Sequence, residues 1–283
     1  MRPVLAVLLA FAAATLYALS TSLQAIEARR TPRSTALRAS LLARLVRRPR
    51  WLAGTAAGVL AWPVQAAALA LGSVALVQPA LGFGLVVLLA LGRGMLGERV
   101  GRREVVGVAA VIGAVAILGW AAPSETGAYT HAGTWIVAIG ILLLGPLPAV
   151  LRRTGHTGGL ATSIAAGIGW GWVAFATSLV DESLADRHFA WAVAWAAGVG
   201  VASWGALLAE STALQEWPAT RAIPIAFGLE MILPAALLPA LTRVAPPHPV
   251  AFVVGLAIAG SAAILLGGSR TVAQAAARPL TEP

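Results

Sequence analysis

AAALALGSVALVQPALGFGLVVLLALGRGMLGERVGRREVVGVAAVIGAVAILGWAAP, residues 66–123, is the stretch that decides the fold of this chain. It contains two apolar runs, each close to the length that crosses a bilayer, joined by an arginine-rich turn. The first run carries Pro79, Gly82 and Gly84 in its interior, where they weaken a helix. Inside a membrane a weakened helix is tolerated where it lines a cavity or packs against other helices. The stretch therefore predicts a membrane hairpin that contributes to a transport path, with a simple packing kink as the alternative.

The composition places the whole chain in a membrane. Of its 283 residues 59% are hydrophobic and 11% are charged, and the mean hydropathy is +0.83, which leaves room for about nine spans. The twenty basic residues are all arginines that fall mainly between the apolar runs, so they indicate topology and not a nucleic-acid surface. The sequence has no cysteine, which excludes disulfides and thiolate metal sites. We expect an all-α membrane protein of about nine transmembrane helices, with no nucleic-acid partner and no cofactor.

The distribution of arginines predicts the topology. Eight arginines lie in the loop between Arg29 and Arg50, and the positive-inside bias places this loop in the cytoplasm. The spans are expected at about 3–25, 51–71, 74–92, 104–121, 132–150, 158–180, 189–214, 219–241 and 249–268. Alternating sides then places seventeen arginines inside. We expect a multi-pass protein of the cell (inner or plasma) membrane, with the N-terminus outside, the C-terminus cytoplasmic and the first span uncleaved.

Two further features concern the segments around the spans. Leucines at helical spacing over residues 34–45 favour an amphipathic helix on the cytoplasmic surface, with an unstructured basic loop as the alternative. Interior tryptophans would line a cavity for an organic solute or serve packing alone. These interior positions are Trp62, Trp170, Trp172, Trp195 and Trp204.

The two halves of the chain carry weak internal matches. Placing Pro79 on Pro224 sets Gln65 on Glu210, at an offset of 145 residues. Spans 1 to 4 then correspond to spans 6 to 9, which cross the membrane in the opposite direction, as in the inverted repeats of secondary transporters. We therefore expect one polytopic domain over residues 1–283. Its parts are repeat one at about 1–125, a linking helix at about 132–150, repeat two at about 158–268 and a short cytoplasmic tail at 269–283.

Few residues inside the predicted spans carry chemistry. Glu230 falls near the middle of span 8, where an ionised carboxylate costs at least about 2.5 kcal/mol, so we expect it to bind a proton or a cation. The alternatives are a protonated packing carboxyl or a pair with Arg221. Glu210, toward the cytoplasmic end of span 7, would frame the same site or lie at the interface, and both acids are the metal ligands if a cation is carried. The other path candidates are Gln65, Gln78, Thr220 and Arg221, and the helix-weakening residues are Pro79, Gly82, Gly84, Pro224 and Gly228.

The predicted spans lack the side chains that intramembrane enzymes use for catalysis. No histidine or cysteine falls at membrane depth and no span contains paired acids, so we do not expect an enzyme. A non-transporting membrane partner or scaffold is the alternative to a transporter, because it would keep the fold without a solute site. The expected partners of a transporter are the lipid bilayer and a small-molecule or cation substrate. The sequence leaves oligomerisation open.

The hairpin resembles the EamA-like drug/metabolite transporter superfamily, and residues 51–125 are similar to the NIPA-like magnesium transporter family. The resemblance lies in Trp51, the entry from Ala70 with Gly72 and Ser73 to Pro79, Gly82, the turn Glu98-Arg99, Gly107 and the closing Ala122-Pro123 with Glu125. It implies an inverted-repeat bundle that moves a small solute or a cation, Mg²⁺ in the second family, by alternating access. Trp62 and Gln65 replace the acid and the asparagine of the magnesium family, and Arg243-Val244 replaces a second Glu-Arg turn. These departures favour the general superfamily.

Overall fold

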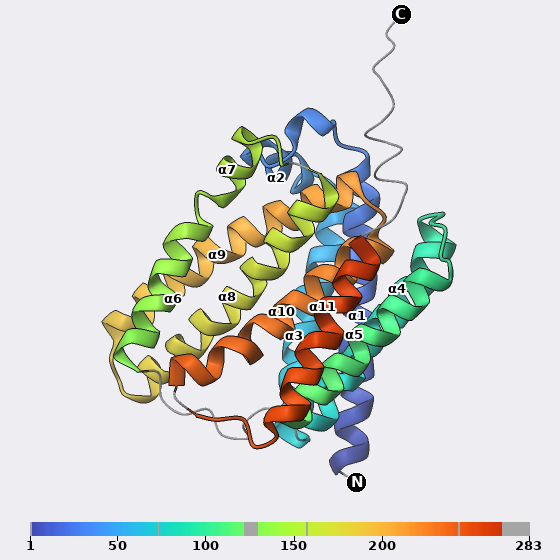
Figure 1. Ribbon diagram of the computed structural model, residues 1–283. Helices are drawn as coiled ribbons and strands as arrows, with labels where there is room; N and C mark the ends of the chain where they lie inside the picture. The colour runs from blue at the N-terminus through green and yellow to red at the C-terminus, as the bar shows by residue number, and fades with distance from the viewer. Residues whose placement is uncertain (1, 73, 122–129, 157, 243, 268–283) are drawn as a thin grey trace, which may run out of the picture.

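Helices form every secondary-structure element in the described part of the chain, which is residues 2–72, 74–121, 130–156, 158–242 and 244–267 of the computed structural model (Figure 1). The long helices are α1 (Arg2–Arg29), α3 (Pro49–Leu71), α4 (Val74–Met95), α5 (Arg102–Ala121), α8 (Gly159–Ala185), α9 (Phe189–Glu216), α10 (Ala219–Thr242) and α11 (Pro249–Gly267). The short ones are η1 (Arg33–Thr35), α2 (Ala39–Leu45), α6 (His131–Leu144) and α7 (Leu147–Arg153). Eight helices are long and apolar enough to cross a membrane, which confirms an all-α, multi-pass membrane protein.

The linking helix expected at about 132–150 is two helices. The axis bends by 46° between α6 and α7, and the pair counts as one further span only when it is taken together. The break falls at Gly145-Pro146. Proline has no N–H to donate to the preceding turn and its ring crowds that turn, so the helix restarts after it.

The basic loop after α1 also forms a helix, but its apolar side faces protein. Leu41, Leu42 and Leu45 of α2 are buried in one cluster with Trp51 and Leu208. Because Leu208 belongs to α9, α2 covers the end of a second-half helix where an amphipathic helix lying on lipid was expected.

The two halves of the chain pack their helices in the same order. In the first half α1 packs against α3 and α4, and in the second half α8 packs against α9 and α10. A Cβ atom at Gly54 of α3 would lie 2.8 Å from the carbonyl oxygen of Ser20, and one at Gly169 of α8 would lie 2.7 Å from Ala206. Only glycine therefore allows α1 to approach α3, and α8 to approach α9, this closely.

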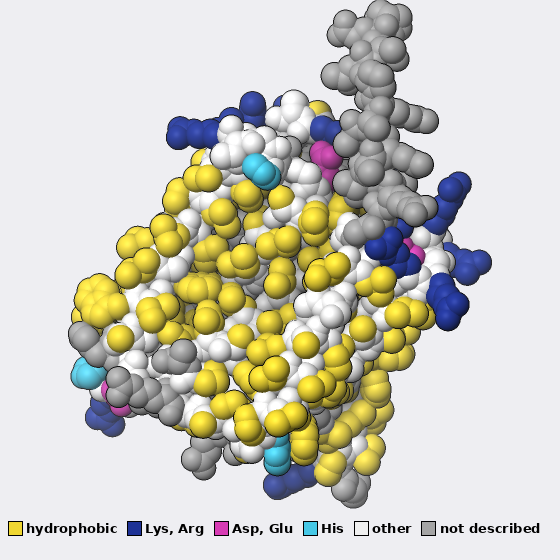
Figure 2. Space-filling view, viewed as in Figure 1, with side chains coloured by type: hydrophobic (Ala, Val, Ile, Leu, Met, Phe, Trp, Pro, Cys, Tyr) yellow, Lys and Arg dark blue, Asp and Glu magenta, His cyan; other side chains and the backbone are white. Residues whose placement is uncertain are grey.

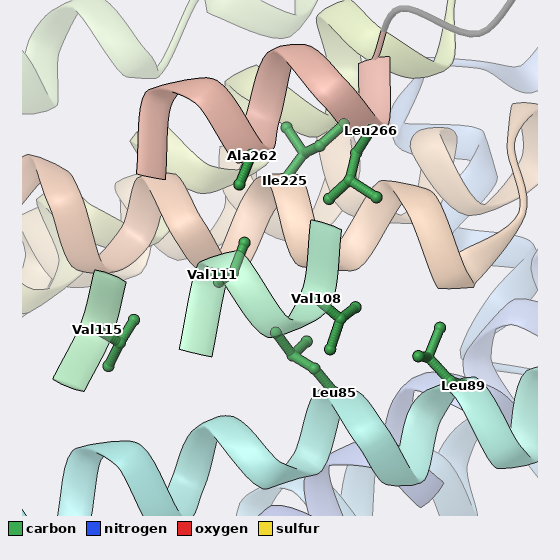
Figure 3. Close-up of a cluster of buried hydrophobic side chains, with 8 residues drawn as sticks. All are labelled: Leu85, Leu89, Val108, Val111, Val115, Ile225, Ala262 and Leu266. Carbon is green, nitrogen blue, oxygen red and sulfur yellow. The ribbon is translucent and has the colours of Figure 1, made fainter. Parts of the chain in front are cut away.

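A shared apolar core joins the halves. Figure 3 shows side chains of α4, α5, α10 and α11 pointing toward one another in this core. Its buried members are Leu85, Leu89, Val108, Val111, Val115, Ile225, Ala262 and Leu266. Gly107 brings α5 and α11 together, since a Cβ there would lie 2.5 Å from the Leu266 side chain.

The proline-containing helices α4 and α10 are continuous. α4 runs through Pro79, and α10 runs through Pro224, Pro234 and Pro239. The weakening therefore consists of missing N–H donors, because each proline leaves the carbonyl four residues earlier without its helical partner. Gly84 has a packing reason, since a Cβ there would lie 2.8 Å from the carbonyl oxygen of Ala14 in α1.

The arginines gather at the end of the bundle that carries α2 and α7. Figure 2 shows the dark blue side chains mainly at this end, above a broad yellow apolar band, with few at the opposite end. Figure 1 places the N-terminus at the opposite end. The predicted features at Ser73, Ala122 to Glu125, Arg243 and the tail 269–283 lie outside the described residues.

Candidate functional site

Three polar side chains from three helices lie at the same depth in the bundle. Tyr17 is twelve residues from the α2/α7 end of α1, and Trp170 and Glu230 are each eleven residues from that end of α8 and α10. At about 1.5 Å per residue these positions are about 16–18 Å deep, near the middle of a hydrocarbon core about 30 Å thick. All three side chains are half-buried.

A second acid joins this group. Glu210 of α9 accepts a hydrogen bond of 2.7 Å from Nε1 of Trp170. Glu230 lies close enough to both Glu210 and Tyr17 to interact with them electrostatically. The two glutamates, called the carboxylate pair below, are therefore brought together from neighbouring helices, although twenty residues separate them in the sequence.

The two members of the carboxylate pair differ in their partners. Glu210 has the indole donor, whereas among the described residues no hydrogen bond or ion pair to Glu230 is found. The pair of Glu230 with Arg221 considered from the sequence is not found among the described residues. Arg221 instead binds Glu104 of α5, with its Nε donating to Oε1 at 2.8 Å and its Nη2 at 2.7 Å.

A second polar cluster lies at the α2/α7 end, where Glu98 caps α10. Its carboxylate accepts hydrogen bonds from the backbone N–H of Ala219 at 2.7 Å and of Thr220 at 2.9 Å, and from the Thr220 hydroxyl at 2.5 Å. Arg29 at the end of α1 donates to the same carboxylate. A negative charge on the free N–H groups of a helix N-terminus is strongly stabilised.

Glu104 adds a second connection between the α4–α5 region and α10. Besides binding Arg221, it accepts a hydrogen bond of 2.8 Å from the backbone N–H of Gly101, which holds the carboxylate in place. We call the group Arg29, Glu98, Glu104, Thr220 and Arg221 the latch. An open cavity of about 430 Å³ lies over the latch, lined by Arg29, Leu96, Gly97, Glu98, Arg99, Gln215, Glu216, Trp217, Pro218 and Arg221.

The candidates predicted from the sequence thus divide into two places. Glu210 and Glu230 meet inside the bundle, whereas Thr220 and Arg221 belong to the latch, about 15 Å from Glu230 along α10. Gln65 of α3 and Gln78 of α4 are half-buried, and among the described residues no hydrogen bond joins either to the carboxylate pair.

The helix-weakening candidates serve mainly packing. Beside Pro79 lies an apolar cavity of about 350 Å³, lined by Val7, Phe11, Leu76, Pro79, Ala80, Phe83 and Ile112. A Cβ atom at Gly82 would touch Ile112 at 3.3 Å, and one at Gly228 would lie 3.8 Å from Val111. Pro224 is buried in α10, one turn below the latch.

Sequence reasoning missed the role of Glu98 and Glu104. The available signal was the presence of two acids in a turn that is otherwise basic. Acids on the arginine-rich side contribute little to topology, so they often have a specific partner. The described residues contain no group of three or more histidines and acids placed to hold a metal ion.

Comparisons with known proteins leave the family open. The chain is 38% identical over 101 residues to an uncharacterized protein of Corynebacterium glutamicum. The match covers 36% of this chain and 35% of the relative, so the chain spans about a third of the length of that relative. No family model matches the chain. No solved structure matches it either.

Proposed function

We propose that this protein is a secondary transporter of the drug/metabolite type, which moves a small solute or a cation across the cell membrane by alternating access. The observation that carries the proposal is the carboxylate pair, which α9 and α10 hold inside the bundle. Ionisable side chains at membrane depth are costly, and they mark substrate paths, ion paths or proton relays. A purely structural acid would have a donor, as Glu98 has, whereas Glu230 has none among the described residues.

The order of helix packing supports an arrangement of two inverted repeats. In this arrangement α1, α3, α4 and α5 correspond to α8, α9, α10 and α11, with α6 and α7 as the link. Corresponding helices are then five spans apart and run in opposite directions. Alternating access is a rocking of one repeat against the other around a site at mid-depth. With the arginine-rich α2/α7 end in the cytoplasm, the N-terminus lies outside and the C-terminus inside.

The two acids have different roles in this mechanism. Glu210 is held by Trp170, so its carboxyl group keeps a fixed position at the site. Glu230 has no such donor, and an isolated charge at this depth is expensive, so it exchanges a proton for a cationic substrate. Tyr17 and Trp170 offer aromatic surface beside the acids, which suits an organic cation or a small organic solute.

Magnesium transport of the NIPA-like kind is the second candidate. Two carboxylates supply oxygen ligands, and Mg²⁺ prefers oxygen and keeps several of its waters. In the described residues no third acid or histidine completes a metal site. The pair alone therefore fits a partly hydrated ion or a singly charged substrate.

Flux into proteoliposomes tests the proposal. Vesicles would carry either a Mg²⁺ indicator or a pH indicator, and a panel of organic cations and neutral solutes would be added outside with and without a pH gradient. We compare the native protein with Glu230→Gln and Glu210→Gln. The matched control is Asp181→Asn, which removes one exposed acid at the far end of α8.

Saturable flux in the native protein and in the control, lost in Glu230→Gln, is the expected result. Mg²⁺ entry without proton movement would select the magnesium candidate, and proton movement driven by an organic cation would select the first. If folded, inserted protein moves neither Mg²⁺ nor protons with any solute of the panel, the proposal is contradicted and a non-transporting membrane partner is favoured.

A further inference from the structure

We infer that the latch is a gate, which closes the carboxylate pair off from the α2/α7 side of the membrane. The inference rests on the proposed function, because a gate presupposes a path. The latch is centred on the α4–α5 turn. Glu98 in this turn binds Thr220, and Glu104 at the start of α5 binds Arg221. Thr220 and Arg221 both lie in the first turn of α10.

Three layers lie along this route. The outermost is the open cavity of about 430 Å³, which has Glu98 and Arg221 in its wall. The latch is the second layer. The third is an apolar plug beside the latch, in which Leu88 of α4 and Leu214 of α9 are 1% and 0% exposed. They pack with alanines of α1 and with Ala219 of α10, whose N–H binds Glu98.

The plug stands between the α2/α7 side and the carboxylate pair. Leu214 lies four residues after Glu210 on α9, so it is on the same face of the helix and one turn nearer the latch. Water and solutes from the α2/α7 side therefore meet the latch and the plug before the carboxylate pair. Both must part before the carboxylate pair is reached.

The latch connects the two halves that would move. Glu98 and Glu104 belong to the first half, and Thr220 and Arg221 belong to the second. Further bonds between the halves lie at the same end, from the amide of Gln215 to the Thr31 hydroxyl at 2.6 Å and from Arg103 Nε to the Leu265 carbonyl at 2.5 Å.

The opposite end of the bundle is joined differently. There the described contacts between the halves are an apolar cluster of Leu118, Ala121 and Phe252 and the stacking of the Trp120 ring on the His248 ring, at 4.2 Å between centroids. Rocking that opens the α2/α7 end must therefore break a set of charge-assisted hydrogen bonds, whereas opening the other end separates apolar side chains and stacked rings. This difference favours the state in which the α2/α7 end is closed.

The latch is also built to be released. Arg29 belongs to the same half as Glu98, so Glu98 keeps this partner when α10 moves away. Arg29 is 29% exposed at its side chain, so water reaches the pair at once. A released Glu98 is therefore not left as a buried, unpaired charge, which would make opening much harder.

The natural absence of cysteine makes the gate directly testable. A single reporter, Leu214→Cys, is placed in the plug of the otherwise native protein and labelled with a membrane-impermeant maleimide. The same reporter is then combined with Glu98→Ala, and in a matched control with Asp181→Asn. Thr154→Cys, an exposed position at the α2/α7 end, calibrates full access of the reagent to that side.

We expect slow labelling of Leu214→Cys in the native background and in the control, and labelling at least about ten-fold faster with Glu98→Ala, since the lost bonds shift the population toward the open state. In sealed vesicles the increase should be seen only from the α2/α7 side. Unchanged labelling in a folded Glu98→Ala variant would overturn the gate. If that variant does not fold, Glu104→Gln decides on the same criterion, with a smaller expected increase.

Labelling needs no substrate, so the gate and the proposed function fail separately. Faster labelling without flux in the native protein would keep the gate as a conformational element and remove transport. Normal flux with unchanged labelling would keep transport and remove the gate.

Discussion

Glu98 and Glu230 are both glutamates enclosed by the helices of this bundle, and their surroundings are opposite. The side chain of Glu98 is 3% exposed and receives three hydrogen bonds from the start of α10 as well as one from Arg29. Glu230, about 15 Å deeper along α10, has no donor among the described residues. Of two acids of the same type, one has its hydrogen bonds supplied by the fold and the other has none among the described residues.

The difference follows from the cost of taking a carboxylate out of water. Around Glu98, backbone N–H groups and a guanidinium group donate the hydrogen bonds that water would otherwise supply. The charge of Glu98 therefore stabilises the folded state. Around Glu230 no donor from the described residues replaces that water, and in the proposed function a bound proton or cation does so. A structural acid should therefore be needed for stability, and a site acid should be needed for transport alone.

Removing the Glu98 side chain should have the largest effect on stability. Glu98→Ala leaves two N–H groups of α10 and the Arg29 guanidinium without their partner, and we expect the free energy of unfolding to fall by about 3 kcal/mol. Denaturant unfolding in detergent, followed by circular dichroism, measures the loss. A loss well under 1 kcal/mol would mean that water replaces the carboxylate and that the contrast with Glu230 is smaller than the contacts suggest.

The second connection of the latch should have a smaller effect. Glu104→Gln keeps an acceptor for the Gly101 N–H but removes the charge facing Arg221, so we expect a loss of about 1–2 kcal/mol. High salt should reduce the difference, because the Arg221 side chain is 23% exposed. The same unfolding assay, run at low and high salt, checks both statements, and a loss as large as that of Glu98→Ala would contradict the ranking.

The Trp170 hydrogen bond, which Glu210 has and Glu230 lacks, should contribute less to the free energy of unfolding than the latch contacts do. Trp170→Phe removes the indole N–H and keeps most of the ring, so we expect a loss of about 1 kcal/mol. The variant also tests position, because Glu210 is then as unsupported as Glu230. Flux measured beside unfolding should show a raised half-saturation concentration, and an unchanged value would mean that Trp170 does not position Glu210.

The smallest effect on stability is expected at Glu230 itself. Glu230→Gln resembles the neutral acid in shape and breaks no described hydrogen bond, so the free energy of unfolding should change by less than about 0.5 kcal/mol. Flux should nevertheless be lost. A large destabilisation with flux retained would reverse the comparison and make Glu230 the structural acid.

Much of the fold was predictable because the membrane imposes length and apolarity on each span. The run from Pro3 to Ala25 and the depth of Glu230 follow from that constraint alone. The bend at Gly145-Pro146 was missed because an apolar run with a proline reads as one span by hydropathy. Trp51 stands at the start of the second predicted span, and its burial under α2 is indicated by no local pattern.

The site was predictable only in part. Glu230 stands out because a charge in an apolar run is rare. Its proximity to Glu210 was predictable because the two acids lie on neighbouring helices. The latch joins Glu98 to Thr220 across 122 positions, and periodicity carries no information about such contacts. Thr220 and Arg221 are path candidates in the sequence because they occupy the start of span 8 in the second repeat, and no signal connects them with the α4–α5 turn.

The three prolines of α10 also give this helix an uneven stiffness. Because Pro234 and Pro239 have no N–H, the backbone carbonyls of Glu230 and Ala235 lack their helical hydrogen bonds to the next turn. The first turn of α10 is instead held by its hydrogen bonds to Glu98. A helix bends most easily where its backbone hydrogen bonds are missing. A displacement of the half of α10 that follows Glu230 would therefore bend the helix at the level of Glu230. The carboxyl group would move with this bend while the first turn, bound to Glu98, stayed in place.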